Sequence, residues 1–261
     1  ASHFGGIFYF YTMDIKQFLD STYLKTPEQA GLSFEENRRI VQGFISEAIE
    51  ERFKLIMIRP DMVAFAKKMI SEAKSKVLVG TVIGFHEGTD SCEEKLSEAQ
   101  KAIEDGADDL DFVCNYEKFK AGDVNSVKEE VLKCTQLGIS NHKTVKWIIE
   151  VAALSDQQII QLTTLIKNVV IANFKEDNYA SVFVKSSTGF FKTEHNLPNG
   201  ATFETMKLMI ENAKPLQIKA AGGVRDYETA VKMITLGVDR IGTSSSKEIC
   251  TNAISSKNSG Y

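Results

Sequence analysis

The sequence predicts one α/β domain with the (β/α)8, or TIM-barrel, architecture. Short apolar runs alternate with longer amphipathic runs from residue 13 onward, which is the pattern of successive βα units. Eight such units can be recognised, and a chain of 261 residues is close to the usual size of a single closed parallel barrel. Two of the apolar runs end in a lysine, Lys185 and Lys219, which indicates that the barrel carries a chemical site.

The expected strands are short, apolar and bounded by glycine, proline or polar turn residues. They cover residues 17–22, 54–58, 77–85, 109–114, 144–150, 181–185, 216–219 and 238–242. Amphipathic runs with helical spacing follow several of them, at residues 34–52, 60–73, 90–105 and 155–174, with further helices expected from about residue 226 and after residue 246. Strand followed by helix, repeated without a low-complexity linker, predicts a parallel sheet closed on itself.

Composition limits the class of ligand and the cellular setting. The net charge is −4 without a basic cluster, which argues against nucleic acid and favours a small-molecule ligand. Four widely spaced cysteines show no CxxC or metal-ligand spacing, so we expect no disulfide framework, no zinc site and a reducing, cytoplasmic location. No run approaches the ~20 apolar residues of a membrane span. A homodimer is possible.

The two ends of the chain stand apart from the barrel pattern. Residues 1–12 precede the first periodic segment and lack the basic region of a signal peptide, so we interpret them as a leader or expression remnant and residues 13–261 as the catalytic domain. Residues 255–261 are small and polar except for Tyr261, and we expect a flexible tail.

Lys185 ends a strand that otherwise consists of valine and phenylalanine. Burying an ammonium group costs several kcal/mol, so this lysine must be paired or neutral. A neutral lysine is a nucleophile, and the residues that follow, Ser186 to Gly189, have the composition of a loop whose backbone N–H groups face a ligand. The alternative is a lysine at a strand end whose ammonium group reaches solvent.

Lys219 occupies the equivalent place on the next strand, before the turn Gly222-Gly223. If both lysines face one cavity, each disfavours the charged form of the other, and burial adds to this effect. The combination lowers a lysine pKa by up to ~3–5 units and supplies the free amine that Schiff-base chemistry requires.

Charged residues also occur inside two other strands. Asp109 and Asp111 share one face of the fourth strand; we expect Asp109 to be solvated at the strand start and Asp111 to lie within the apolar run. Asp111 is either an acid/base group or a structural partner of a lysine. On the fifth strand, Lys146 and Glu150 lie on the face opposite Trp147, as at a polar barrel mouth.

The loops after strands seven and eight often bind phosphate in such barrels. Gly222-Gly223 and the run Gly242-Thr243-Ser244-Ser245 supply the N–H groups and hydroxyls for an oxyanion at these two places. The alternative interpretation is an ordinary glycine turn for Gly222-Gly223 and a serine N-cap for the run at residues 242–245.

These residues resemble one family, deoxyribose-phosphate aldolase, over nearly all of residues 15–261. The most specific motifs are VKSSTGF at residues 184–190 and KAAGGVR at residues 219–225. LDST at residues 19–22, VIGF at residues 82–85 and GADDLD at residues 106–111 support them. The resemblance implies a (β/α)8 class I aldolase that uses neither a metal nor a cofactor.

The resemblance also implies a role for each matching residue. Lys185 would form the imine, Lys219 would be its electrostatic neighbour, Asp111 would relay protons and Tyr261 would fold over the barrel mouth to assist. The residues implied to bind the substrate are Asp20 and Thr22 at its hydroxyls and Thr188, Gly189, Gly222, Gly223, Ser244 and Ser245 toward its phosphate. For Tyr261 the alternative is a disordered end without a role.

The implied reaction is the reversible cleavage of 2-deoxy-D-ribose 5-phosphate to acetaldehyde and D-glyceraldehyde 3-phosphate. The substrates, a phosphorylated sugar and an aldehyde, are small molecules. Two other classes remain open: a phosphate-sugar isomerase on the same fold, and a phosphate-binding protein without catalysis. One departure from the family pattern concerns the substrate loop, where Phe190 stands in place of a phosphate-contacting lysine that some members have.

Overall fold

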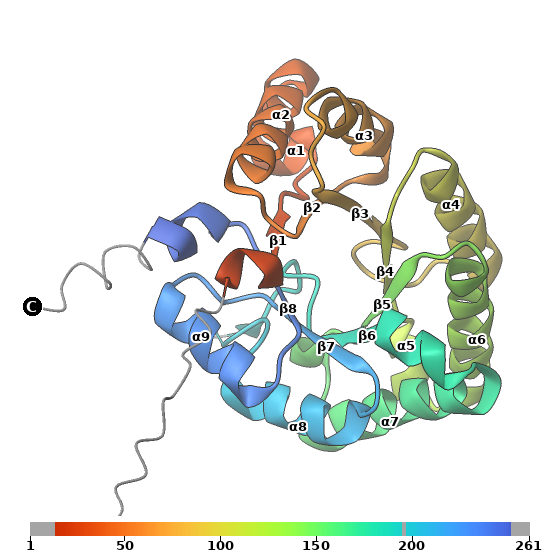
Figure 1. Cartoon of the computed structure of the whole chain (residues 1–261). Helices are drawn as coiled ribbons and strands as arrows, with labels where there is room; N and C mark the ends of the chain where they lie inside the picture. Colours follow the sequence, from red (N-terminus) through yellow and green to blue (C-terminus); the bar gives the residue numbers. More distant parts are fainter. Residues whose placement is uncertain (1–13, 195–196, 252–261) are drawn as a thin grey trace, which may run out of the picture.

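The computed structural model describes residues 14–194 and 197–251, which form a (β/α)8 barrel. Eight parallel strands, β1 to β8, pair in chain order and the sheet closes between β8 and β1. Helices surround the strands on the outside (Figure 1). The predicted TIM barrel is therefore confirmed. The predicted leader and tail lie outside the described residues.

The strands are four to six residues long and match the predicted ones in number and order. Their bounds are β1 Leu19–Thr22, β2 Leu55–Ile58, β3 Leu78–Ile83, β4 Asp109–Val113, β5 Thr144–Ile148, β6 Val182–Lys185, β7 Gln217–Ala221 and β8 Arg240–Thr243. The first predicted strand was too long at its start, because residues Ile15–Phe18 form a 3-10 helix, η1.

The outer layer consists mainly of α-helices. They are α1 Pro27–Ala30, α2 Phe34–Glu51, α3 Val63–Glu72, α4 Cys92–Glu104, α5 Tyr116–Lys120, α6 Val124–Ser140, α7 Asp156–Asn173, α8 Phe203–Ala213 and α9 Tyr227–Leu236, with short 3-10 helices η2 Pro60–Met62, η3 Val151–Ala153 and η4 Glu176–Ser181. Residues 246–251 are also helical. The sequence pattern had not delimited α5, α6 or α8.

Helix starts are encoded locally by capping residues. Ser33, Ser91 and Ser155 each accept a hydrogen bond from the backbone N–H three residues later, and the Glu or Gln at that position bonds back to the serine N–H. Such capping boxes satisfy backbone donors that the first helical turn leaves free. The predicted start of α4 at residue 90 was early because Ser91 is its cap.

The fifth strand ends earlier than predicted. β5 stops at Ile148, and Glu150 has a φ of 54°, in the left-handed region. Period-two alternation therefore does not extend to Glu150, although this side chain is buried and faces the loop after β6. The prediction that Lys146 points away from Trp147 is correct, since Lys146 contacts aspartates inside the barrel and Trp147 lies in the outer core.

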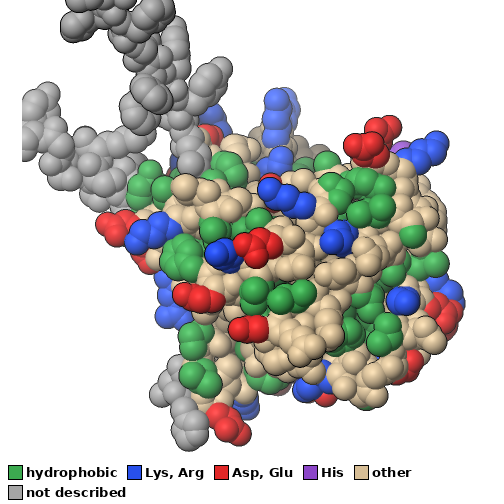
Figure 2. Space-filling model, turned by 90° about the horizontal axis from the view of Figure 1, so that it is seen from below, with side chains coloured by type: hydrophobic (Ala, Val, Ile, Leu, Met, Phe, Trp, Pro, Cys, Tyr) green, Lys and Arg blue, Asp and Glu red, His purple; other side chains and the backbone are tan. Residues whose placement is uncertain are grey.

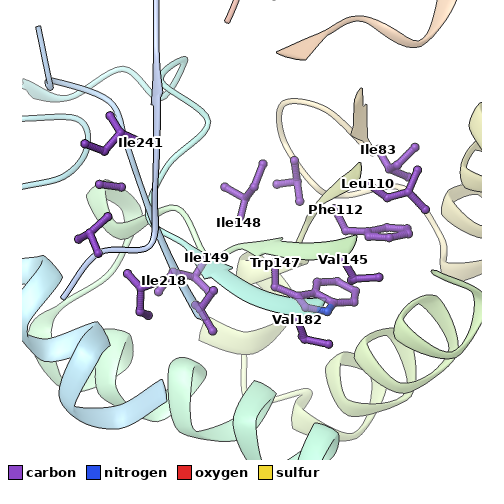
Figure 3. Packing of buried hydrophobic residues seen from close by; sticks show 14 of the residues in the cluster. Ile83, Leu110, Phe112, Val145, Trp147, Ile148, Ile149, Val182, Ile218 and Ile241 are labelled. Carbon is purple, nitrogen blue, oxygen red and sulfur yellow. The ribbon is translucent and has the colours of Figure 1, made fainter. Parts of the chain in front are cut away.

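The main hydrophobic core fills the space between the strands and the helices (Figure 3). Trp147 is fully buried there, stacks on Phe112 with ring centroids 5.2 Å apart, and donates its indole N–H to Thr135 Oγ1 at 3.0 Å. A second, smaller cluster of Leu24, Leu55, Met57 and Val82 is separate from this core. Because Ile56 and Ile58 belong to the main core, alternation along β2 turns Leu55 and Met57 into the barrel.

The surface carries charges of both signs. On the face shown in Figure 2, lysine and arginine side chains are interspersed with aspartate and glutamate, and hydrophobic side chains are scattered among them. Within residues 14–194 and 197–251, no helix is long and apolar enough to cross a membrane.

We predict that Thr135→Val destabilises the protein by about 1–3 kcal/mol, because the buried indole N–H of Trp147 loses its acceptor. Thr163→Val is the matched control. Thr163 is equally buried, but its hydroxyl has no hydrogen-bond partner among the described residues, so its replacement costs nothing or stabilises. The fluorescence of Trp147, the single tryptophan of the chain, reports unfolding in urea. Equal effects of the two substitutions would contradict this prediction.

Candidate active site

Lys185 and Lys219 both contact the same carboxylate. Lys185 is the last residue of β6 and lies beside Lys219 of β7 in the strand register. Lys185 Nζ donates to Asp111 Oδ2 at 2.8 Å, and Lys219 Nζ donates to the same oxygen at 2.9 Å. The exposed fraction is 3% for Lys185 and 0% for the other two residues. Two lysines and one aspartate from three strands therefore meet inside the barrel.

More charged residues extend this cluster across the barrel interior. Lys146 of β5 donates to Asp111 Oδ1 at 2.8 Å and to Asp109 Oδ2 at 2.6 Å. Asp20 of β1 lies 2.6 Å from Lys219 Nζ through its Oδ2 and accepts hydrogen bonds from Arg240 of β8 through its Oδ1. We call the set of Asp20, Asp109, Asp111, Lys146, Lys185, Lys219 and Arg240 the ionic network.

The charges of the ionic network do not balance when all its members are ionised. Lys146, Lys219 and Arg240 match the three aspartates, and Lys185 is the surplus cation. Burial lowers the pKa of Lys185, the nearby charge of Lys219 lowers it further, and Asp111 opposes both; the result is a pKa of about 8. The Lys185 side chain is thus neutral in roughly one tenth of the molecules at pH 7.

Asp20 and Asp111 are held in their charged form. Burial would raise the pKa of Asp20, but the positive charges of Arg240, Lys219 and Lys146 outweigh it and lower the pKa to about 2. For Asp111, burial is likewise outweighed by Lys146, Lys185 and Lys219, and the pKa lies well below its usual value. Both carboxylates are therefore stabilised in the ionised form by the cations around them.

A cavity of about 240 Å³ opens above the network at the carboxyl ends of the strands. Lys185 is the member of the network that lines it. Most of the substrate-binding residues predicted from the sequence line it as well, namely Thr22, Thr188, Gly189, Gly222, Gly223 and Ser244. Asp20 instead lies within the network, and Ser245 is not among the described residues that line the cavity.

The loop after β7 has the backbone that its glycines allow. Gly222 and Gly223 have φ values of 81° and 92°, which other residues rarely adopt. A Cβ atom on Gly222 would also come within 2.9 Å of Gly200 Cα. Arg225 and Ser244, which follow β7 and β8, line the cavity as well. N–H groups, a hydroxyl and a guanidinium at this place suit an anionic group on a ligand.

The loop after β6 is fixed by side-chain hydrogen bonds. Ser186 Oγ donates to the carbonyl of Ala221 and accepts from its N–H, which ties the loop to β7. Glu150 Oε2 accepts hydrogen bonds from the N–H and the hydroxyl of Thr188. Burial raises the pKa of Glu150, while the hydrogen bonds from Thr188 oppose that shift. The loop beside Lys185 is thus held in place from β7 on one side and from the segment that follows β5 on the other.

Sequence reasoning missed part of the ionic network. Asp109 was expected to be solvated, but it is 1% exposed because Lys146 covers it and Arg240 Nη2 lies 3.7 Å away. Arg240 was not singled out, although an arginine in an apolar strand was a signal. Lys146 was noticed only as part of a polar face. Tyr261 lies outside the described residues, so its role stays a prediction.

No group of three or more His, Cys, Asp or Glu side chains within residues 14–194 and 197–251 is arranged to hold a metal ion. The aspartates of the network are instead paired with Lys146, Lys219 and Arg240.

A closed parallel barrel with a buried lysine at the carboxyl end of one strand fits the class of aldolases, enzymes that cleave or form carbon–carbon bonds. The chain belongs to the DeoC/LacD family of aldolases, whose sequence model matches residues 30–251. It is 37% identical to the deoxyribose-phosphate aldolase of Thermococcus gammatolerans over 92% of this chain and 97% of that protein. It is 36% identical to the Staphylococcus haemolyticus enzyme of the same name, over 91% of this chain and 96% of that protein.

A solved structure agrees with these relatives. The tetrameric deoxyribose phosphate aldolase of Aeropyrum pernix superposes with a TM-score of 0.74 at 28% identity, over 93% of this chain and 92% of that one.

We predict that two substitutions move the pKa of Lys185 in opposite directions. Lys219→Leu removes a neighbouring positive charge and raises it, whereas Asp111→Asn removes the paired negative charge and lowers it. The rate of Lys185 carbamylation by cyanate against pH, followed by peptide mass spectrometry, gives this pKa. Exposed Lys192 is the internal reference. Shifts of the same sign in both variants would show that the charges are not coupled as described.

We also predict that Lys185→Met stabilises the protein at pH 7. The pKa of Lys185 is lowered from 10.5 to about 8, so the folded state binds this proton more weakly than the unfolded state. Below pH 8 the resulting destabilisation of the folded state is on the order of 3 kcal/mol. It disappears as the pH rises toward 10.5, the pKa of this lysine in the unfolded chain. Chemical unfolding at pH 7 and pH 10 measures it, with Lys192→Met as the control. A Lys185→Met variant less stable than the parent at pH 7 would refute the prediction.

Proposed function

We propose that this aldolase reversibly cleaves 2-deoxy-D-ribose 5-phosphate to acetaldehyde and D-glyceraldehyde 3-phosphate through a Schiff base on Lys185, without a metal ion. The observation that carries the proposal is the surplus lysine: Lys185 is buried, its pKa is lowered to about 8, and it faces the cavity. The names of the relatives point to the same substrate.

In the first step, the neutral Nζ of Lys185 attacks the aldehyde carbon C1 of the open-chain sugar. The product of this attack is a carbinolamine, in which C1 carries both the lysine nitrogen and a hydroxyl group. The hydroxyl group takes up a proton and leaves as water, and a protonated imine remains. The imine keeps one positive charge at this place, so the charge balance with Asp111 is the same as with protonated Lys185. Lys219 lowers the pKa of Lys185 and so increases the fraction that can attack.

In the second step, the bond between C2 and C3 breaks and its electron pair moves to C2 to form an enamine, because the iminium withdraws electrons. The C3 hydroxyl loses its proton toward Asp111, through a water molecule, and becomes the aldehyde of D-glyceraldehyde 3-phosphate. Asp111 is suited to relay this proton because two lysines share its Oδ2. Protonation of C2 and hydrolysis of the imine then release acetaldehyde.

The anionic end of the substrate would occupy the part of the cavity formed by Gly222, Gly223, Arg225 and Ser244. Backbone N–H groups at Gly222 and Gly223 can approach a phosphate closely because no side chain intervenes. Thr22, which lines the cavity at the end of β1, would contact a substrate hydroxyl.

Two other functions would use the same phosphate loops. An isomerase would not need the lowered pKa of Lys185, and a binding protein would need neither Lys185 nor its coupling to Asp111 and Lys219. The ionic network therefore favours the aldolase. A homodimer, a cytoplasmic location and an assisting role of Tyr261 remain predictions.

Borohydride reduction in the presence of acetaldehyde should add one ethyl group, and peptide mass spectrometry should find it at Lys185. Lys185→Arg should abolish both the label and the cleavage of 2-deoxy-D-ribose 5-phosphate, whereas Lys192→Arg, an exposed lysine of the same loop, should change neither. Chelation with EDTA should leave the rate unchanged. A label at Lys219 would reverse the two lysine roles, and substrate binding without any label would favour a binding protein.

A further inference from the structure

Glu150 is a buried carboxylic acid to which the reaction described above assigns no role. Its side chain follows the end of β5 and is 1% exposed. Its Oε1 is buried and has no hydrogen-bond partner among the described residues. An ionised carboxylate is costly to bury when one of its oxygens lacks a partner, so this place favours the protonated acid.

The backbone on both sides of Glu150 is tied to the end of β6. The N–H of Ile149 donates to the carbonyl of Lys185 at 3.0 Å. The N–H of Val151 donates to the carbonyl of Ser186 at 2.8 Å. Between these two bonds Glu150 has a φ of 54°, which residues other than glycine rarely adopt. Strain of this kind persists where the surrounding structure requires it, and it clusters at functional sites.

The Thr188 hydroxyl connects Glu150 to the cavity. Thr188 and Lys185 both line the cavity, whereas Glu150 is not among the described residues that do. The N–H of Thr188 donates to Glu150 Oε2 at 3.1 Å, and its hydroxyl donates to the same oxygen. Thr188 Oγ1 also accepts from the N–H of Phe190 at 3.0 Å. When a protonated Glu150 donates to Oγ1 instead, both acceptor sites of the hydroxyl are filled, and its O–H is free to donate into the cavity.

The charge of Lys185 is coupled to the protonation of Glu150. Burial raises the pKa of Glu150, and the hydrogen bonds from Thr188 and the positive charge of Lys185 oppose this shift. One proton can therefore lie on either residue, as an ammonium beside a carboxylate or as a free amine beside a carboxylic acid. Tyr116 is also close to Glu150, but burial and then the charge of Glu150 raise the pKa of Tyr116 to about 12, so this phenol stays neutral.

The form with a free amine and a carboxylic acid has both groups that imine formation needs. The neutral Nζ of Lys185 is the nucleophile, and the acid is the source of the proton with which the carbinolamine hydroxyl leaves. The total charge is the same before and after the reaction, because an iminium beside a carboxylate replaces an ammonium beside a carboxylate.

We propose that Glu150 supplies, through the Thr188 hydroxyl, the proton with which the carbinolamine on Lys185 loses water. This inference rests on the proposed function and assigns the proton source of its first step. Glu150 gives its proton to Thr188 Oγ1, and Thr188 gives its own proton to the carbinolamine oxygen. The bond between C1 and this oxygen breaks, its electron pair leaves with water, and the nitrogen lone pair forms the C=N bond.

The products of this step are the iminium, water and the Glu150 carboxylate. The reverse steps hydrolyse the imine of the released aldehyde and return the proton to Glu150. Glu150 does not touch the substrate, so it is a positioning residue that acts through Thr188.

Glu150→Gln tests this role, because a glutamine oxygen still accepts both hydrogen bonds from Thr188 but the side chain has no acidic proton. The protein is mixed rapidly with acetaldehyde and quenched into borohydride after increasing times, and mass spectrometry measures the ethyl label on Lys185. Glu150→Gln should form the imine about 100-fold more slowly at pH 7, as expected when a general acid is lost. The final amount of label should equal that of the parent, because the ammonium and the iminium carry the same charge.

Thr188→Val and Thr188→Ser test the connection independently. Valine keeps the shape of threonine but lacks the hydroxyl, so Thr188→Val should slow imine formation as much as Glu150→Gln does. The double variant should be no slower than either single variant, because both remove the same proton path. Thr188→Ser keeps the hydroxyl and should stay close to the parent.

Glu194→Gln is the matched control, since Glu194 is an exposed glutamate of the same loop after β6. It should change neither the rate nor the final amount of label. An unchanged rate in Glu150→Gln, or a lower final amount of label at every acetaldehyde concentration, shows that Glu150 only holds the loop and overturns the inference. If Glu150→Gln does not fold, equal rates in Thr188→Val and the parent overturn it. Absence of label in the parent overturns the proposed function itself.

Discussion

The arrangement inside the barrel depends on one carboxylate, Asp111, which is shared by Lys146, Lys185 and Lys219. A buried charge without a partner costs several kcal/mol, so each ion requires the others. These ions come from β4, β5, β6 and β7, and Asp20 and Arg240 add β1 and β8. The network can form only when the barrel is closed, and the closed barrel must accommodate one cation more than its carboxylates balance.

That surplus charge links stability to chemistry. A pKa of about 8 for Lys185 means that the folded protein keeps an ammonium group where it is unfavourable, and the same property makes the amine available near neutral pH. The apolar region around Leu24 and Phe190 adds a second kind of surface to the cavity without touching this balance. The charged and the apolar residues therefore occupy different parts of the barrel interior.

Much of the fold was predictable because its determinants are local. Eight apolar runs and their amphipathic partners gave the strands in the observed order, and capping residues such as Ser33 and Ser155 fixed helix starts. Lys185, Lys219 and Asp111 stood out because a charged residue within an apolar strand is costly and needs a reason. The glycines of the β7 loop were interpretable because their backbone conformation excludes other residues.

The sequence alone determined that the chain forms a parallel barrel and that charged residues would lie inside it. Only the tertiary structure decided which charges pair, because closing the sheet brings Asp20 next to Lys219 and Arg240, more than 190 residues away along the chain. Asp109 was misjudged for this reason: a strand start that looks open to solvent lies beneath Lys146 once β5 is paired with β4. Likewise, Phe190 meets Phe85 only across the barrel mouth. The order of residues within a short segment determines whether it forms a helix or a strand. The pKa values and the cavity walls depend instead on distances between segments that are far apart in the sequence.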